Sequence, residues 1–187
     1  MEIRPLTSET WPDFEKLMGP KGGYGGCWCM LWRKTKADHD RDSGDVNKAE
    51  IRKLAESDLP PGLLARIDGE PAGWISVAPR SAFIRLQGSR VLQPVDEEPV
   101  WSVSCFLIAK VHRRKGVAEA LLHAACAFVR ERGGTSLEGY PIAPSKTPYP
   151  AAYAWTGFAT VFERVGFEEI ARRSPTRPIM RKSLGQR

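Results

Sequence analysis

The sequence predicts one α/β domain spanning residues 1–187, and three observations lead to this fold class. A chain of 187 residues can form one hydrophobic core without a metal or a disulfide to hold it. Residues 101–108 are uncharged and rich in β-branched and aromatic side chains, as expected of a strand inside a sheet. After a basic turn, Val117, Leu121, Ala125 and Phe128 recur at helical spacing, so a helix with one buried face follows the strand.

The other elements follow from the same two periodicities. Strand-like runs lie at residues 3–7, 63–67, 71–78, 135–140, 167–173 and 178–183. Apolar residues at helical spacing lie at residues 11–18, 46–57 and 158–165. The turn at Asp68 and Gly69 predicts an antiparallel hairpin, because both residue types tolerate positive φ. The expected loops are residues 19–26, 34–44, 79–99 and 141–157.

The turn before the helix at Val117 has the features of an anion-binding site. The first N–H groups of a helix lack intrahelical partners and lie at the positive end of its dipole. Gly116 lets the backbone come close to a phosphate. Four cations surround the same point: Lys110, Arg113, Arg114 and Lys115. We therefore expect a diphosphate here, while the absence of the two commonest phosphate-loop patterns argues against a kinase or a dinucleotide-binding protein.

Two segments resemble motifs of one enzyme superfamily. Residues 113–118, Arg-Arg-Lys-Gly-Val-Ala, resemble the R/Q-x-x-G-x-G/A segment of the GNAT superfamily of acetyl-coenzyme A dependent N-acetyltransferases. Residues 162–167, Phe-Glu-Arg-Val-Gly-Phe, resemble its later Y-E-K-x-G-F segment. The resemblance implies a mixed, mostly antiparallel sheet flanked by helices and splayed near the strand that ends at Ile108. It also implies acetyl-CoA as co-substrate.

In this resemblance, the pantetheine arm pairs with the edge of the strand and the diphosphate lies on the N–H groups of the turn. The implied cofactor-binding residues are Phe106, Leu107, Ile108, Arg113, Arg114, Lys115, Gly116, Val117 and Ala118. We expect Gly116→Val to abolish acetyl-CoA binding and to leave the stability nearly unchanged. The chain departs from the family pattern at Phe162, because the family has a tyrosine there that is thought to protonate the CoA thiolate. Phenylalanine has no proton to donate, so this role is not carried over.

Candidates for the acceptor side come from two segments. Residues 27–33 are dense in large apolar groups, and the resemblance makes Trp28, Met30 and Trp32 candidate walls of the acceptor pocket, with core packing as the alternative. Tyr140 is a further candidate for contact with the acceptor. Glu138 is the first choice for the general base, because burial beside the cleft could raise its pKa, although a solvated or ion-paired glutamate stays open. Weaker candidates for proton transfer are Cys105, Tyr140 and His112.

Composition excludes several classes of protein. With 42% hydrophobic and 27% charged residues, the chain is neither disordered nor membrane-spanning, and no secretory signal begins it, so we expect a cytoplasmic protein. The four cysteines are expected to be free thiols, and the spacing of Cys27, Cys29 and His39 does not match usual zinc sites, so no metal is expected. A net charge of +6 without a helix-turn-helix, zinc-finger or RNP pattern argues against nucleic acid as the partner.

The predicted function is transfer of an acetyl group from acetyl-CoA to a primary amine by direct attack. The acceptor is a small molecule or a peptide that the sequence does not identify. A ping-pong route through an acetyl-cysteine is not favoured, since no thiol lies next to an evident base. A non-catalytic acyl-CoA sensor stays open because of Phe162, and so does a homodimer.

Overall fold

The computed structural model describes residues 1–144, 149–150 and 153–185. The strands are β1 (Glu2–Pro5), β2 (Gly62–Ile67), β3 (Glu70–Pro79), β4 (Trp101–Ile108), β5 (Ser136–Gly139), β6 (Glu168–Arg172) and β7 (Pro178–Ser183). The α-helices are α1 (Trp11–Met18), α2 (Lys36–Arg41), α3 (Asp45–Ala55), α4 (Ile84–Gln87), α5 (Val117–Glu131) and α6 (Ala159–Arg164). Two 3₁₀ turns are η1 (Arg80–Ala82) and η2 (Lys110–His112).

The strands form a single seven-stranded sheet in the order β1-β2-β3-β4-β5-β7-β6. β4 and β5 pair in parallel, whereas the other neighbours in this order pair antiparallel. The predicted α/β fold with a mixed, mostly antiparallel sheet is therefore confirmed. The predicted hairpin is β2 and β3, with Asp68 at φ 51° and Gly69 at φ 81° in its turn.

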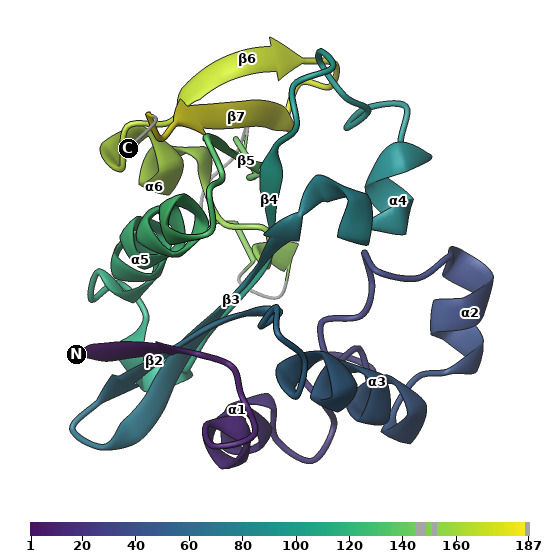
Figure 1. Ribbon diagram of the computed structural model, residues 1–187, viewed down its shortest axis with the longest axis vertical. Helices are drawn as coiled ribbons and strands as arrows, with labels where there is room; N and C mark the ends of the chain where they lie inside the picture. The colour runs from purple at the N-terminus through teal and green to yellow at the C-terminus, as the bar shows by residue number, and fades with distance from the viewer. Residues whose placement is uncertain (145–148, 151–152, 186–187) are drawn as a thin grey trace.

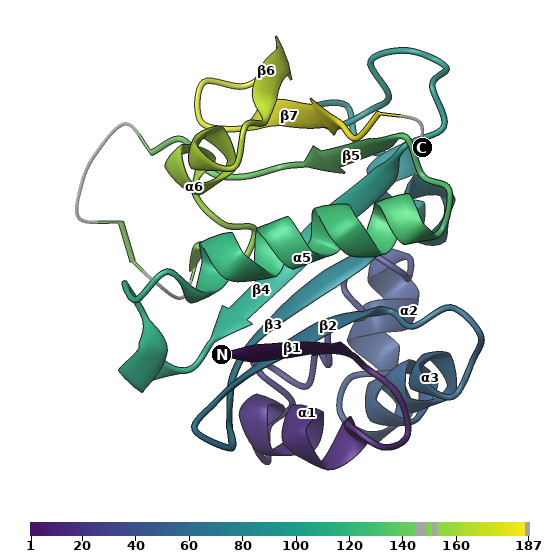
Figure 2. The same ribbon diagram turned by 60° about the vertical axis from the view of Figure 1, so that its left-hand side comes forward.

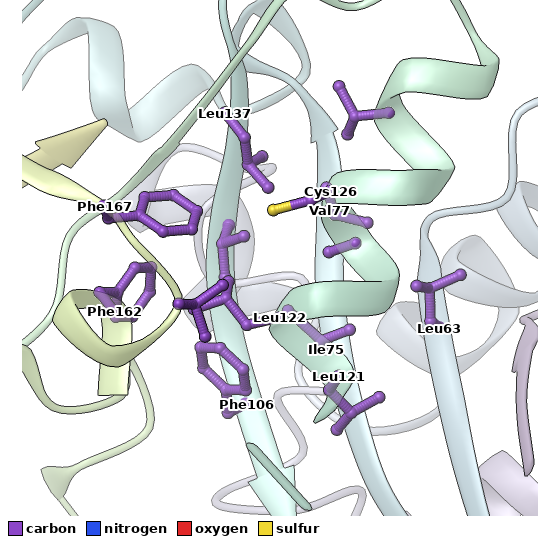
Figure 3. Close-up of a cluster of buried hydrophobic side chains, with 14 of the residues drawn as sticks. Leu63, Ile75, Val77, Phe106, Leu121, Leu122, Cys126, Leu137, Phe162 and Phe167 are labelled. Carbon is purple, nitrogen blue, oxygen red and sulfur yellow. The ribbon is translucent and has the colours of Figure 1, made fainter. Parts of the chain in front are cut away.

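Helices cover both faces of the sheet. α5 and α6 lie on one face, and α1, α3 and α4 on the other (Figure 1). In the turned view, α5 lies across β2, β3 and β4 (Figure 2). Alternate residues of these strands, among them Leu63, Ile75 and Val77, pack against Leu121 and Leu122 of α5 (Figure 3). The intervening residues Leu64 and Trp74 pack with α1 and α3. The strand and helix periods of the sequence thus produce a core on each face.

Two short helices lie where the sequence predicted loops. α2 falls within residues 34–44 and buries no residue, so it has no apolar stripe to detect. It is held instead by its N-cap, where the Thr35 side chain accepts a hydrogen bond from Asp38 N–H at 3.2 Å, and by an ion pair between Arg41 and Asp38 at 2.8 Å. α4, within residues 79–99, has only four residues and buries Leu86.

β4 and β5 part soon after they begin to pair, and we call this point the fork. Their register runs from Trp101 opposite Leu137 to Val103 opposite Gly139 and stops there. On its other edge, β4 shifts register against β3, because Ser76 lies opposite Cys105 and Val77 opposite Val103. Ser104 is therefore the extra residue of a bulge at the fork. Bulges re-aim side chains and are common beside active sites.

Candidate functional site

The backbone between β4 and α5 forms an open cradle of N–H groups. Two of its residues have positive φ, Arg114 at 62° and Gly116 at 77°. In the part of the chain that the structure describes, the N–H groups of residues 114–119 donate no hydrogen bond, and the helical ladder begins with Ala120 N–H to Gly116 O at 3.0 Å. A Cβ built on Gly116 would meet no atom within 4 Å. Unpaired N–H groups at an open helix N-terminus bind anions.

Basic side chains surround this cradle. The exposed cations are Lys110, Arg113, Arg114 and Lys115. Within the described ranges, none of them lies within 4.0 Å of a carboxylate. The acidic residue of the first helical turn, Glu119, pairs instead with Arg164 at 2.8 Å. The cradle therefore carries positive charge that is free to attract a polyanion.

One edge of β4 leads from the fork to the cradle. Ala109 N–H donates to Ala72 O of β3, and the N–H groups of successive residues point to opposite edges of a strand. The N–H groups of Phe106 and Ile108 therefore face away from β3. Phe106 N–H donates to Trp155 O at 2.6 Å. The Trp155 segment thus occupies part of this edge, and Ile108 N–H is the donor nearer the cradle.

The face of the fork opposite α5 is polar and buried. It carries side chains that are at most 2% exposed: Ser76, Ser102, Ser104, Glu138 and Tyr140. Ser104 Oγ donates to Ser76 Oγ at 3.1 Å, and Ser102 Oγ lies 2.8 Å from the Tyr140 hydroxyl. The α5 face of the same strands is lined by Val103, Leu137 and other apolar residues. The polar groups of the fork therefore lie on the face opposite α5, which we call the polar face.

Residues 26–143 match the acetyltransferase (GNAT) family. The chain belongs to the GNAT acetyltransferase family. No curated protein sequence matches the chain.

Solved structures of GNAT proteins share the fold over nearly the whole chain. An acetyltransferase from Listeria monocytogenes 4b F2365 has a TM-score of 0.58 at 12% identity, covering 97% of this chain and 94% of that one. The PaiA N-acetyltransferase from Thermoplasma acidophilum, solved in complex with coenzyme A, has a TM-score of 0.57 at 13% identity, with coverages of 97% and 98%. The ribosomal-protein-alanine N-acetyltransferase from Brucella melitensis has a TM-score of 0.57 at 18% identity, with coverages of 98% and 99%. At these identities the likeness shows a shared fold.

The predicted cofactor residues lie in one continuous strand, turn and helix, but their side chains point in different directions. Phe106 and Val117 are buried in the core under α5, at 6% and 1% exposure, so only their backbone is left for the predicted contact with a ligand. Leu107 packs on the opposite face of the sheet. Contact of CoA with these residues stays a prediction. The side chains available for this contact are those of the exposed cations of the cradle.

Glu138 lies on the polar face, where it pairs with two arginines. Arg181 donates to Glu138 Oε1 from Nε at 3.0 Å and from Nη2 at 2.7 Å. Arg80 Nη1 lies 3.6 Å from Oε2, and the Tyr140 hydroxyl donates to the same oxygen at 3.0 Å. Both carboxylate oxygens are therefore engaged within the protein. The prediction that Glu138 is the general base is untested, and these contacts favour the ion-paired alternative.

Tyr140 is buried at the centre of the same network. Its hydroxyl contacts Ser102, Glu138 and Arg80. Burial and the nearby charge of Glu138 raise the pKa of the Tyr140 hydroxyl well above its usual value. The side chain is 1% exposed, so it supports the polar face from within, and its predicted contact with the acceptor stays a prediction.

The structure separates the three predicted walls of the acceptor pocket. Trp28 and Met30 are 4% and 5% exposed and pack in the core with α1 and α3. Trp32 is half-buried, and its ring lies 5.9 Å from the ring of Trp155, whose carbonyl holds the edge of β4. Of the three, Trp32 is thus the one that lies near the Trp155 segment at the edge of β4, and acceptor binding by these residues stays a prediction.

Phe162, at the position of the GNAT tyrosine, is completely buried. Its ring packs edge-on against the rings of Phe106 and Phe167, with 6.0 Å and 5.1 Å between the ring centroids. These three rings lie together in Figure 3. Gly139 at the end of β5 makes room for it, because a Cβ on Gly139 would lie 2.0 Å from the Phe162 ring. The side chain is therefore part of the core.

Sequence reasoning did not select several residues that build the site. Arg80 and Arg181 hold Glu138, Trp155 holds the edge of β4, and Arg33 lies close to Cys29, whose Sγ is 3.5 Å from Cys105 Sγ. Arginines are common surface residues, and no local pattern marks the ones that turn inward. Their roles depend on partners far away in the chain.

No helix within the described ranges is long and apolar enough to cross a membrane. The same residues contain no group of three His, Cys, Asp or Glu side chains placed to hold a metal ion. A cytoplasmic location and a homodimer stay predictions.

Proposed function

We propose that the protein transfers an acetyl group from acetyl-CoA to a primary amine by direct attack. The observation that carries this proposal is the cradle, at the end of a strand that leaves its parallel neighbour. Among the described residues, the N–H groups of residues 114–119 have no acceptor and the four cations have no carboxylate within 4.0 Å. A diphosphate fits such a cradle by charge and by the open space beside Gly116. Membership of the GNAT family and the CoA complex of a protein with the same fold support it.

In the proposed reaction, the acceptor nitrogen attacks the thioester carbon from the polar face. The C–N bond forms, the carbonyl electrons move onto oxygen, and the intermediate collapses with loss of the CoA thiolate. The ammonium form of the acceptor must first lose a proton, and the nitrogen gives up a second proton as the amide forms, which the departing thiolate or water accepts. Glu138 is kept as the candidate for this step, with the alternative that it positions Tyr140 and Ser102 through the contacts described above.

The experiment is a thiol-release assay with acetyl-CoA and a panel of amines, amino sugars, amino acids and short peptides. Release of CoA that depends on the added amine, with matching acetylated product by mass spectrometry, supports the proposal. Release without any added amine serves as the control for hydrolysis.

A second candidate function is an acyl-CoA sensor without turnover. Two observations favour it: Phe162 replaces the tyrosine of the motif and is buried, and both oxygens of Glu138 are engaged by arginine and tyrosine. A sensor would gain thermal stability from acetyl-CoA and release no thiol with any acceptor. Amine-dependent release of CoA would eliminate this candidate.

A further inference from the structure

Arg33 is a half-buried cation that has no acidic partner among the described residues. Among the described residues, no carboxylate lies within 4.0 Å of its guanidinium. Nη2 donates to Pro61 O at 3.3 Å, and the guanidinium lies 4.7 Å above the ring of Phe83. Nε is fully covered and has no partner. Burial lowers the pKa of Arg33 to about 10, so the side chain still carries its charge at neutral pH.

Two other arginines on the polar face are neutralised by carboxylates. Arg80 faces Glu138, and Arg181 binds Glu138, Asp96 and Glu98. Removing a cation from water is costly unless an anion or several hydrogen bonds compensate it. One carbonyl and one aromatic face compensate Arg33 only in part. The protein keeps a positive charge here that an incoming anion can neutralise.

Hydrogen bonds place this charge beside the fork. Pro61 O, the acceptor for Arg33, also lies 3.5 Å from Ser76 Oγ, which in turn accepts from Ser104 Oγ at 3.1 Å. Ser104 is the bulge residue of β4 and directly follows Val103, the last residue paired with β5. The guanidinium is thus linked through three hydrogen bonds to the point where the strands part.

The neighbours of Arg33 confirm its side of the sheet. Cys29 lies close enough to influence the pKa of Arg33, and Cys29 Sγ is 3.5 Å from Cys105 Sγ on β4. The ring of Trp32, the preceding residue, lies tilted against the ring of Trp155 at the edge of β4, with 5.9 Å between the ring centroids. Arg33 therefore lies on the face from which the acceptor approaches in the proposed reaction.

We propose that Arg33 binds a carboxylate group of the acceptor, so that the substrate is an amino acid or another small amine that carries a carboxylate. This inference rests on the proposed function. A guanidinium donates charge-assisted N–H···O bonds to a carboxylate, and one singly charged anion neutralises one half-buried cation. Nη1 is the atom available for this contact, because it has no partner within the described chain and is not fully covered.

The test compares acceptors in pairs that share the amine and differ only at the carboxylate. The twenty common amino acids and their carboxamides are assayed for acetyl-CoA dependent thiol release. We expect the acids to exceed their amides by about 30-fold or more in kcat/KM. Arg33→Gln should lower kcat/KM for the acid about 100-fold, chiefly through KM, and leave the amide rate and CoA affinity unchanged.

The matched control is Arg85→Gln. Arg85 is also half-buried and donates to a carbonyl of the same segment, Leu31 O at 3.3 Å, and it has no role in the proposed site. This variant should keep the preference for acids. If Arg33→Gln does not fold, Arg33→Lys keeps the charge without the planar donor pair and should lose part of the preference.

A binding measurement separates this inference from the proposed function. The preferred amino acid should raise the Tm of the CoA complex, and the rise should vanish in Arg33→Gln. Turnover of amides as fast as acids would overturn the carboxylate proposal and leave the acetyltransferase standing. Arg33-dependent stabilisation without any turnover would overturn the acetyltransferase and leave the carboxylate site standing. If the protein shows no turnover of acids and no Arg33-dependent stabilisation, the carboxylate site is overturned.

Discussion

Substitution of Gly116 by alanine tests the anion cradle, and Gly133 at the other end of α5 supplies a matched control. Gly116 has φ 77° and Gly133 has φ 76°, and a Cβ at either position meets no atom within 4 Å. Both substitutions carry the same backbone strain, about 1–2 kcal/mol for a side chain in the left-handed region. In a chain of this size each kcal/mol lowers Tm by about 2–4 °C. The expectation that a side chain at Gly116 leaves stability nearly unchanged is therefore wrong, because the sequence does not reveal the sign of φ.

Of the two substitutions, only Gly116→Ala should weaken the binding of CoA. Its methyl group enters the space beside the unpaired N–H groups, where the diphosphate is proposed to lie, and we expect a loss of at least tenfold in Kd, or about 1.4 kcal/mol. Calorimetric titration with CoA measures the affinity, and thermal unfolding of the same samples measures the strain. Equal CoA affinity in the Gly116 and Gly133 variants would refute the placement of the diphosphate.

Three further outcomes are expected. Glu138→Gln should lower the free energy of unfolding in urea by about 2 kcal/mol, because Arg181 loses the negative charge of its partner. It should also lower kcat about 10²-fold or more if Glu138 is the base, and a loss under tenfold would reject that role. Gly139→Ala should destabilise the fold by about 1–3 kcal/mol because its Cβ overlaps the Phe162 ring, and an unchanged urea midpoint would contradict this packing. Burial raises the pKa of Cys27 from 9.0 to about 11, so between these pH values the unfolded chain has lost a proton that the folded chain keeps, and stability should fall by about 1–3 kcal/mol as pH rises. Cys27→Ser should flatten that slope, and an equal slope in both proteins would count against the burial of the thiol.

The strand, turn and helix of the cradle could be predicted because their causes are local. Residues 101–108 and the helix from Val117 have the bounds expected from the apolar run and the helical spacing. The glycine and the cations of the turn lie within a few residues of the N–H groups that they serve. The α2 helix could not be predicted in the same way, because capping and ion pairs hold it and no apolar stripe marks it.

The residues of the acceptor side and their contacts could not be predicted, because they come from parts of the chain that are far apart in the sequence. Glu138 was selected for a burial that the structure does have, but its partners Arg80 and Arg181 approach from β3's end and from β7, and no spacing in the sequence links them. Arg33 differs from Arg80 and Arg181 in that no carboxylate among the described residues pairs with it, and a missing partner leaves no mark in a sequence.

The cradle is local in the sequence and the acceptor side is not, so the specificity for the acceptor can change separately from the binding of CoA. The cradle depends on backbone N–H groups and on one short segment, so it can stay constant while the residues around Arg33, Glu138 and Trp155 are exchanged one at a time. Because these residues contact the fork from separate elements, a substitution at one of them can alter the acceptor without disturbing the site proposed for CoA. The Arg33 and Gly116 variants should therefore separate cleanly, with the first affecting the KM of the acceptor and the second the Kd of CoA.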